Sequence, residues 1–283
     1  RANTWFAYFG ETLSLRMFST FPDSHSFPMF LLLSLIAVCS LLRTSNAKFI
    51  KYSFVIIPFY LAVILSGTRG MWLAGISIII IPVLIWFDKN KIETINRKYI
   101  WGSLIIFVAL FSIAYPILAS PQFHVAKESS ELLKARIKSI LDFDEISNKG
   151  RIYIWNRTIK SIIRNPILGV GIGNFPSVLE QDIALAKAGS TAHNIYLNIA
   201  AEMGIPALIA FLYLLKITYS RLIRLLKTGV EMIKQYALWS LIYLGWVLVY
   251  SLTDAVLFDE RTLLLFGINI ALINGLSNSG LKE

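Results

Sequence analysis

Apolar runs divided mostly by short polar connections dominate the chain, and their pattern predicts its fold. A straight membrane helix needs about 20 apolar residues, so the flanks of the shorter runs must complete them. The pattern predicts an all-α integral membrane protein, a polytopic transmembrane helix bundle with a large, partly helical extracytoplasmic loop. The seven runs are Pro28–Leu42, Ile50–Leu65, Met71–Phe87, Tyr99–Ala119, Ile205–Leu215, Tyr236–Leu257 and Leu263–Leu276.

The runs divide the chain into three parts. Residues 1–119 should hold four membrane spans, at about 28–43, 50–66, 71–87 and 99–119. Residues 120–204 should form the extracytoplasmic loop that carries the catalytic elements. Residues 205–283 should hold three more spans, at about 205–222, 235–257 and 261–277. Residues 1–27 resemble neither a signal peptide nor a span, and we expect the chain to be the C-terminal part of something longer.

Composition and charge fix the class and the orientation. With 56% hydrophobic and only 16% charged residues, the chain fits neither a disordered protein nor a soluble domain. Loops 43–51, 88–98 and 216–234 hold twelve Lys or Arg residues against three acidic ones, whereas the short connections opposite hold only Arg69 and Arg261. The positive-inside rule makes the basic loops cytoplasmic and puts the long loop outside. The basic pI therefore reflects topology and gives no support to nucleic-acid binding.

The residues that commonly bind metals are few and scattered. Cys39 is the only cysteine, and His25, His124 and His193 show no metal-ligand spacing. Residues 142–145 hold three carboxylates but lack the spacing of a calcium loop, which favours a solvated turn. We expect metal-free chemistry with no cofactor; a metal held by oxygen ligands is the alternative.

Two helices are predicted within the long loop. Residues 125–141 have the apolar period of an amphipathic helix lying on the bilayer or the bundle. A second helix should run from Ser147 to Arg164 and end before Pro166. Arg151 and Trp155 are four residues apart and share a face of this helix. The cations Arg157, Lys160 and Arg164 form another stripe, for which contact with lipid headgroups is the expected role.

Two turns outside the membrane carry further candidates. Gly169, Gly171 and Gly173 alternate without the spacing of a dinucleotide-binding loop, so they indicate a tight turn or a close backbone approach. In the turn before the third span, Thr68 should cap the helix. Arg69 beside the free helix N–H groups would form a small anion site. The alternative is an interfacial Arg, with Trp72 as an aromatic of the membrane belt.

The chain should re-enter the membrane through a short helix over residues 191–203. Asn194, Asn198 and Glu202 recur every four residues, and such a polar face must line a cavity or pack on protein. With Thr191 as the cap, His193 would lie in the first turn, where the helix dipole disfavours its charged form and leaves it able to accept a proton. A lone histidine is more often structural, but these neighbours favour catalysis.

Four segments together resemble the superfamily of O-antigen ligases and Wzy-type O-antigen polymerases. Each is weak alone, but their order, spacing and shared outer location make the combination specific, and it spans most of the chain. The family typically has more spans than seven, in agreement with a missing N-terminal part. The segments are residues 66–73 (SGTRGMWL), 150–155 (GRIYIW), 165–175 (NPILGVGIGNF) and 192–197 (AHNIYL), the last followed by 202–205 (EMGI).

The resemblance implies a chemistry and a site. Family members transfer glycan from an undecaprenyl-pyrophosphate carrier to an acceptor hydroxyl, and attack on an α-linked donor would invert the anomeric centre. Arg69 and Arg151 are similar to the two essential arginines and His193 to the essential histidine, while Thr68 stands where serine is frequent. Two arginines would bind the pyrophosphate and a neutral His193 would take the hydroxyl proton. The candidate substrate-binding residues are Trp72, Trp155, Asn194, Tyr196, Asn198, Glu202 and Arg157.

The resemblance also implies partners and a location. We expect a multi-pass protein of the bacterial cytoplasmic (inner) membrane with its site facing the periplasm or exterior. Its acceptor would be a lipid-linked repeat or lipid A-core, and a chain-length regulator is a possible partner. A polymerase is slightly preferred over a ligase, and a protein-glycosylating relative stays open. The alternatives are a transporter or flippase of an anionic lipid-linked saccharide, which needs no proton acceptor, and a structural subunit, which leaves the polar face unexplained.

Overall fold

A computed structural model describes residues 6–9, 12–15, 17, 19–21, 24–44, 48–75, 97–119, 146–179 and 191–279. The described chain is mostly helical, as expected, with one small exception near the N-terminus. Strands β1 (Phe6–Phe9) and β2 (Thr12–Leu15) pair antiparallel, with Phe6 opposite Leu15. The sequence analysis did not predict this hairpin, although its Phe, Tyr and Thr residues favour strands.

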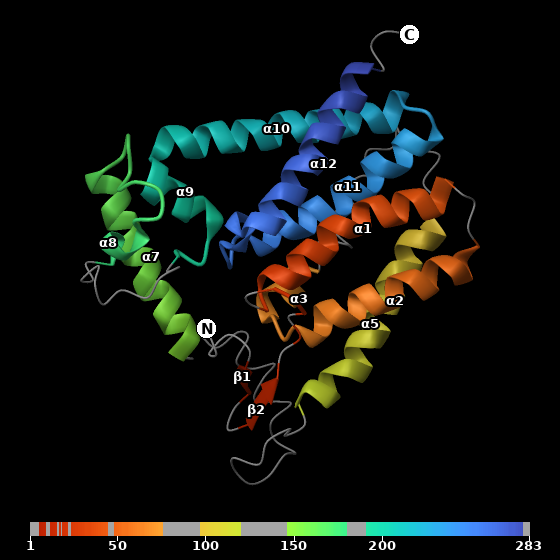
Figure 1. The fold of residues 1–283 in the computed structure, drawn as a ribbon, viewed down its shortest axis with the longest axis horizontal. Helices are drawn as coiled ribbons and strands as arrows, with labels where there is room; N and C mark the ends of the chain where they lie inside the picture. The colour runs from red at the N-terminus through yellow and green to blue at the C-terminus, as the bar shows by residue number, and fades with distance from the viewer. Residues whose placement is uncertain are drawn as a thin grey trace.

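The long helices of the described chain lie alongside one another in the main body (Figure 1). Helix α1 packs mainly against α11, and α2 mainly against α5. Four shorter elements complete the described fold: α3 (Arg69–Ala74), α8 (Phe175–Val178), α9 (Ile195–Met203) and η2 (Val256–Phe258). The long helices are α1 (Ser26–Thr44), α2 (Phe49–Leu65), α5 (Arg97–Ala119), α10 (Ile205–Thr228), α11 (Glu231–Tyr250) and α12 (Glu260–Ser279), and α7 (Ile146–Arg164) stands beside them.

Large aromatic side chains fill the centre of this bundle. The fully buried ones are Tyr52, Tyr60, Trp239, Tyr243, Trp246 and Tyr250. Several of their polar groups find partners inside: the Tyr60 hydroxyl lies 3.1 Å from that of Tyr243, and the Trp246 indole donates to the Met71 carbonyl oxygen at 2.7 Å. Among the described residues the buried Trp239 indole N–H has no such partner. Pairing of this kind avoids the cost of a polar group buried away from water.

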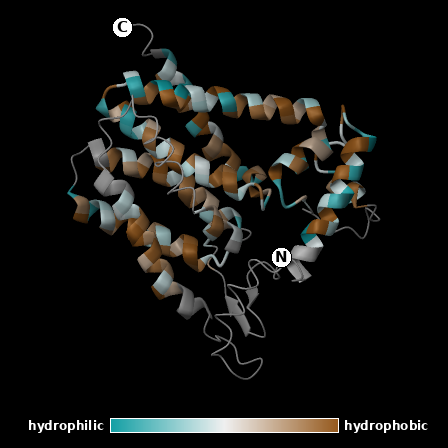
Figure 2. Ribbon diagram, turned by 180° about the vertical axis from the view of Figure 1, so that it is seen from behind, coloured by the Kyte–Doolittle hydropathy of each residue, from teal (hydrophilic) through white to brown (hydrophobic). Residues whose placement is uncertain are grey.

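The outward faces of the helices are apolar. Phe54, Ile105, Ile209 and Leu264 are all more than 60% exposed, and hydrophobic residues predominate along α10 (Figure 2). Among the described residues, α10 and α11 are long and apolar enough to cross a membrane, and residues 26–42, 49–65 and 101–114 form shorter apolar helices. The seven-span division stays a prediction, and most of its third span, like the amphipathic helix at 125–141, lies outside the described residues.

The bundle has two distinct ends. The α1–α2 and α10–α11 connections lie at one end, and the α2–α3 and α11–α12 connections lie at the other (Figure 1). The N-terminal segment covers this second end, where the Met17 N–H donates to the Leu65 carbonyl oxygen at 3.0 Å and Arg261 donates to the Thr20 carbonyl oxygen at 2.7 Å. Helices α7, α8 and α9 stand beside this second end, which carries the candidate site.

Candidate functional site

Helix α9 begins at Ile195, two residues after His193, and this places the histidine in the loop before it. Asn194 caps the helix, since its side-chain oxygen accepts the Leu197 N–H at 3.0 Å. The prediction of Thr191 as the cap is wrong: its hydroxyl oxygen accepts the His193 N–H at 3.3 Å, two residues before the helix. His193 has φ +48°, in the left-handed region that non-glycine residues rarely occupy. Such strain persists where the surroundings over-determine a conformation, and it clusters at functional sites.

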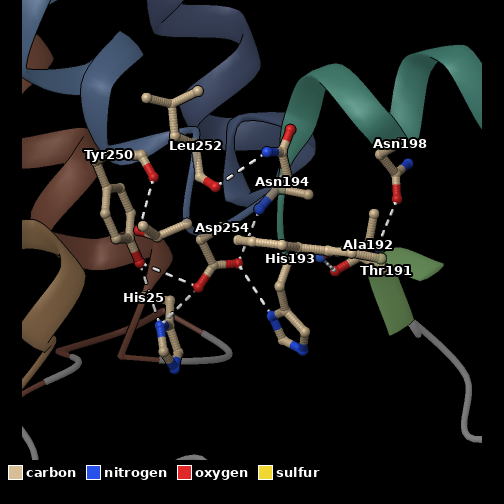
Figure 3. Close-up of polar contacts among 12 residues, drawn as sticks. His25, Thr191, Ala192, His193, Asn194, Asn198, Tyr250, Leu252 and Asp254 are labelled. Carbon is tan, nitrogen blue, oxygen red and sulfur yellow. Dashed lines mark hydrogen bonds and ion pairs between the residues drawn. The ribbon is translucent and has the colours of Figure 1, made fainter. Parts of the chain in front are cut away.

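The His193 ring faces the buried carboxylate of Asp254 (Figure 3). Its Nδ1 lies 3.7 Å from Asp254 Oδ1, within ion-pair range but longer than a hydrogen bond. Among the described residues Nδ1 is buried with no other partner, although the side chain as a whole is 43% exposed. The carboxylate favours a proton on Nδ1, and this leaves a lone pair on Nε2.

Asp254 is held by groups from two other segments. Its Oδ2 lies 2.9 Å from His25 Nδ1 and accepts the Tyr250 hydroxyl at 3.1 Å, while Oδ1 accepts the Ala255 N–H at 2.8 Å. Burial by itself would raise the pKa of Asp254. Interactions with His25, the larger effect, and with His193 outweigh burial and hold the pKa of Asp254 well below its usual value. The carboxylate is therefore a permanent negative charge behind His193.

Helix α7 is joined to the same loop through Trp155. The Trp155 indole N–H donates to the Ala192 carbonyl oxygen at 2.9 Å, next to His193. Arg151 lies one helical turn earlier on the same face of α7 and is half-buried. Within the described residues it has no hydrogen bond or ion pair, so its five N–H donors are available to a ligand. The predicted helix from 147 to 164 is confirmed.

Helix α3 approaches the Asp254 turn from the other side. Gly70 is so close to Thr253 that a Cβ there would overlap the Thr253 hydroxyl oxygen. Arg69, the first residue of α3, is therefore adjacent in sequence to this contact. Thr68 precedes the helix, but its side chain does not cap it, contrary to prediction. Its hydroxyl instead donates to the Ser24 carbonyl oxygen at 3.1 Å, which attaches the N-terminal segment to this turn.

These contacts bring three segments that are distant in the sequence to one end of the bundle. A sequence model of the O-antigen ligase family matches residues 52–212, which is more than half of the chain and includes Arg69, Arg151 and His193. The chain belongs to the O-antigen ligase family. No curated protein matches the chain. This bacterial membrane family acts in polysaccharide biosynthesis, with ligase-type transfer on lipid-linked glycans.

The sequence analysis did not predict three residues of this candidate site: His25, Tyr250 and Asp254. The sequence analysis placed Asp254 inside the apolar run 236–257 and therefore inside a span. In the structure α11 ends at Tyr250, and Asp254 lies in the turn that follows. An acidic residue within an apolar run is itself a signal, since a charge in the membrane is costly and usually functional. His25 gave no comparable signal, because its contact with Asp254 joins residues far apart in the chain. Asp254 also lies beyond the residues that the family model matches.

The predicted polar face of α9 packs on protein. The Asn198 side chain accepts the Ala192 N–H at 3.0 Å and donates to Glu202 at 3.2 Å. The Asn194 amide donates to the Leu252 carbonyl oxygen at 3.1 Å, and the Tyr196 hydroxyl donates to that of Leu248 at 3.0 Å. These contacts hold the His193 loop and the Asp254 turn together, and substrate contact by the same side chains stays a prediction.

The glycine turn, residues 165–174, packs against the end of α9. Gly169 has φ +64° and lies so close to Glu202 that a Cβ would overlap the backbone of that residue. Burial raises the pKa of Glu202, while hydrogen bonds from the Gly173 and Phe175 backbone and from Asn198 act in the opposite direction. The prediction of a tight turn with a close backbone approach is confirmed.

Two other predicted substrate residues have partners within the protein. Trp72 is buried and lies edge-on to Phe111, with ring centroids 5.1 Å apart. The Arg157 guanidinium lies 5.6 Å from the centroid of the Tyr153 ring on the same helix. Among the described residues no cluster of His, Cys, Asp or Glu could hold a metal ion. Metal-free chemistry stays a prediction.

Proposed function

We propose that the chain is a membrane glycosyltransferase that transfers or polymerises glycan repeat units from an undecaprenyl-pyrophosphate donor to an acceptor hydroxyl. It acts on the outer face of the cytoplasmic membrane. The observation that carries the proposal is a half-exposed histidine backed by a buried carboxylate, His193 with Asp254, beside the arginine-bearing helices. An O-antigen, capsule or exopolysaccharide polymerase is slightly preferred over an O-antigen ligase.

His193 is the general base of the proposed reaction. Its Nε2 takes the proton of the acceptor hydroxyl while that oxygen forms a bond to the anomeric carbon of the donor. The proton then rests on His193, and Asp254 stabilises the resulting imidazolium across the 3.7 Å contact. Asp254 acts through the histidine, so it is a positioning residue. A pair of this kind costs little reorganisation, since the buried carboxylate is already ionised.

Arg151 and Arg69 bind the pyrophosphate in this proposal. The bond between the anomeric carbon and the pyrophosphate oxygen breaks as the new glycosidic bond forms, and its electrons stay on the leaving oxygen. A guanidinium fork matches such oxygens with two parallel hydrogen bonds, which become stronger as charge develops. Attack opposite the leaving group inverts the anomeric centre, and neither a metal nor a carboxylate nucleophile takes part.

The remaining predicted substrate residues surround this centre. Trp155 and Asn194 hold the loop that carries His193, and Asn198 and Glu202 hold α9 behind it. Trp72, Tyr196 and Arg157 are proposed to contact glycan or lipid. The donor, the acceptor (a lipid-linked repeat or lipid A-core) and a chain-length regulator are the proposed partners.

The His193–Asp254 pair also favours an enzyme over a transporter. A flippase for an anionic lipid-linked saccharide needs cations along its path but no proton acceptor with an ionised carboxylate behind it. A transporter would therefore tolerate the loss of His193.

The decisive experiment uses the full-length protein, purified in lipid nanodiscs, with a lipid-linked repeat as donor. His193→Ala should lower the rate of glycan transfer by about 10²–10⁴-fold, the usual contribution of a general base. Arg151→Lys keeps the charge but loses the fork and should also reduce transfer. Lys51→Ala, an exposed cation at the start of α2 and at the opposite end of the bundle, is the control and should leave the rate unchanged. Wild-type transfer by His193→Ala would disprove the catalytic role.

Three further measurements test the finer claims. Mass analysis of the product distinguishes a polymer of repeats from a single transfer to lipid A-core. We expect the polymer. Activity in the presence of a metal chelator should equal activity without it. Nuclear magnetic resonance of the new linkage should show the anomeric configuration opposite to that of the donor.

A further inference from the structure

The glycine turn exposes three large apolar side chains on one short stretch. Ile167, Leu168 and Ile172 are 69%, 82% and 77% exposed. We propose that these side chains rest in the outer interface of the lipid bilayer, so that the turn is a membrane anchor for the catalytic loop. The proposal depends on the membrane placement of the family and of α10, and it does not require the reaction proposed above.

The exposure of these side chains is built into the fold. The Val170 and Gly171 N–H groups donate to the Ala201 and Glu202 carbonyl oxygens, both at 2.9 Å. The Ile205 N–H donates to the Pro166 carbonyl oxygen at 2.8 Å. With its backbone attached to both α9 and α10, the turn presents its apolar side outward. Exposed apolar patches of this kind mark interaction surfaces.

The length of α10 puts the turn at the bilayer boundary. From Ile205 to Ser220, the residue before Arg221, the helix rises about 24 Å at about 1.5 Å per residue. The hydrocarbon layer is about 30 Å thick. The long side chain of the exposed Lys216 can extend towards the headgroups. If Arg221 marks the inner boundary, the outer boundary falls about one helical turn beyond Ile205, and this is the level of the glycine turn.

The surface of the turn continues the lipid-facing surface of α10. Ile205, Ile209 and Tyr213, one turn apart along one face of the helix, are 40%, 61% and 61% exposed. Figure 1 shows the turn beside the start of this helix. Only 11% of the residues in the most apolar stretch of α10 are buried inside the protein. The exposed apolar residues at the start of α10 and those of the turn are therefore neighbours.

The charges next to the turn also suit a lipid surface. Lys160 and Arg164 are exposed on the last turns of α7, immediately before the turn. Long cationic side chains at this level reach phosphate oxygens of the headgroups while their stems lie on apolar surface. An apolar patch followed by cations is the pattern of an interfacial anchor. The anchor would hold α7 and α9, with Arg151 and His193, at the height of a lipid-linked pyrophosphate.

Spin labelling of the full-length protein tests the proposal without any need for turnover. The variants Leu168→Cys and Ile172→Cys are made in a Cys39→Ala background and placed in nanodiscs of phosphatidylethanolamine and phosphatidylglycerol. Ile209→Cys on α10 is the lipid reference, and Ser177→Cys, exposed on α8 in the same loop, is the aqueous reference. The measurement is the ratio of label collisions with oxygen, which concentrates in lipid, to those with a water-soluble nickel chelate.

The labels at Leu168 and Ile172 should give a ratio several-fold above that at Ser177 and close to that at Ile209. A ratio equal to that at Ser177 would overturn the proposal, because the turn would then face water. Exclusion of both reagents would overturn it as well, because a protein surface would then cover the turn. If His193→Ala retains activity but the labels report lipid, the anchor stands and the proposed reaction fails.

Discussion

The carboxylate of Asp254 between His25 and His193 determines the chemistry at the residue scale. A histidine alone on a surface loop has no fixed tautomer. The buried charge 3.7 Å from Nδ1 supplies one and directs Nε2 outward. His25 and the Tyr250 hydroxyl in turn fix the orientation of the carboxylate, at 2.9 and 3.1 Å. The N-terminal segment, through His25, therefore takes part in building a site whose other residues come from much later in the chain.

Asp254→Asn should lower kcat for glycan transfer by on the order of 10²-fold with little change in KM, because the neutral amide no longer stabilises the imidazolium. The double variant with His193→Ala should be no slower than His193→Ala alone, since residues that act as a unit are not additive. Steady-state rates of the three variants provide the measurement. A double variant that is slower by the product of the single effects would mean that Asp254 acts independently of His193.

The low pKa of Asp254 also has a consequence for stability. A carboxyl whose pKa is lower in the folded than in the unfolded protein stabilises the fold at any pH above its pKa in the unfolded protein. This stabilisation is lost as the pH falls through the pKa of the folded protein. The folded value lies well below 3.8. The difference in thermal midpoint between wild type and Asp254→Asn should thus still be present at about pH 5 and should shrink only below about pH 4, where an ordinary carboxyl begins to bind protons. A difference that shrinks between about pH 7 and pH 5 would contradict the assignment.

Close backbone packing is the controlling feature at the scale of elements. The glycine turn, the end of α9 and the start of α10 meet without intervening side chains. Gly204, between the two helices, has φ +86°, and a Cβ there would overlap the Ile167 carbonyl oxygen. The close approach attaches α7 and α9 to a membrane helix, and the site depends on that attachment.

Gly204→Ala should therefore destabilise the protein, by about 1–3 kcal/mol from the backbone conformation and more from the overlap. The matched control is Gly267→Ala in α12, where a Cβ meets nothing within 4 Å. Alanine is the better helix former by about 1 kcal/mol, so the control should be neutral or stabilised. Thermal midpoints of both variants in the same detergent provide the measurement. Equal thermal midpoints for the two variants would show that the turn accommodates the added Cβ without loss of stability.

Local patterns in the sequence predicted where these elements lie. They could not predict which residues from distant parts of the chain contact one another. The Asn165–Pro166 signal and the period of α7 located that helix. The choice between Thr191 and Asn194 as cap depended on which side chain meets the Leu197 N–H, and both residue types are good caps. The polar face of α9 was seen, but its partners at Leu248 and Leu252 could not be inferred from periodicity.

At the scale of the whole molecule, the candidate site and the basic α10–α11 connection occupy opposite ends of the described bundle. The basic residues Arg221 and Arg224 hydrogen-bond to Asn274 and Ser277 of α12, and these contacts join the two helices near one end. The Asp254 turn and His193 lie at the other end. If the basic end faces the cytoplasm, the site opens on the outer surface, where a lipid-linked glycan is used after it has crossed the membrane.

Single cysteines at the two ends test this orientation. Leu252→Cys, in the exposed turn after α11, should react with a membrane-impermeant maleimide in intact spheroplasts. Thr228→Cys, exposed at the end of α10, should react only after the membrane is permeabilised, because the positive-inside rule puts it in the cytoplasm. The parent protein is the control, since Cys39 is buried. The opposite labelling pattern would place His193 on the cytoplasmic side, where a donor that has already crossed the membrane is absent, and the proposed reaction could not take place there.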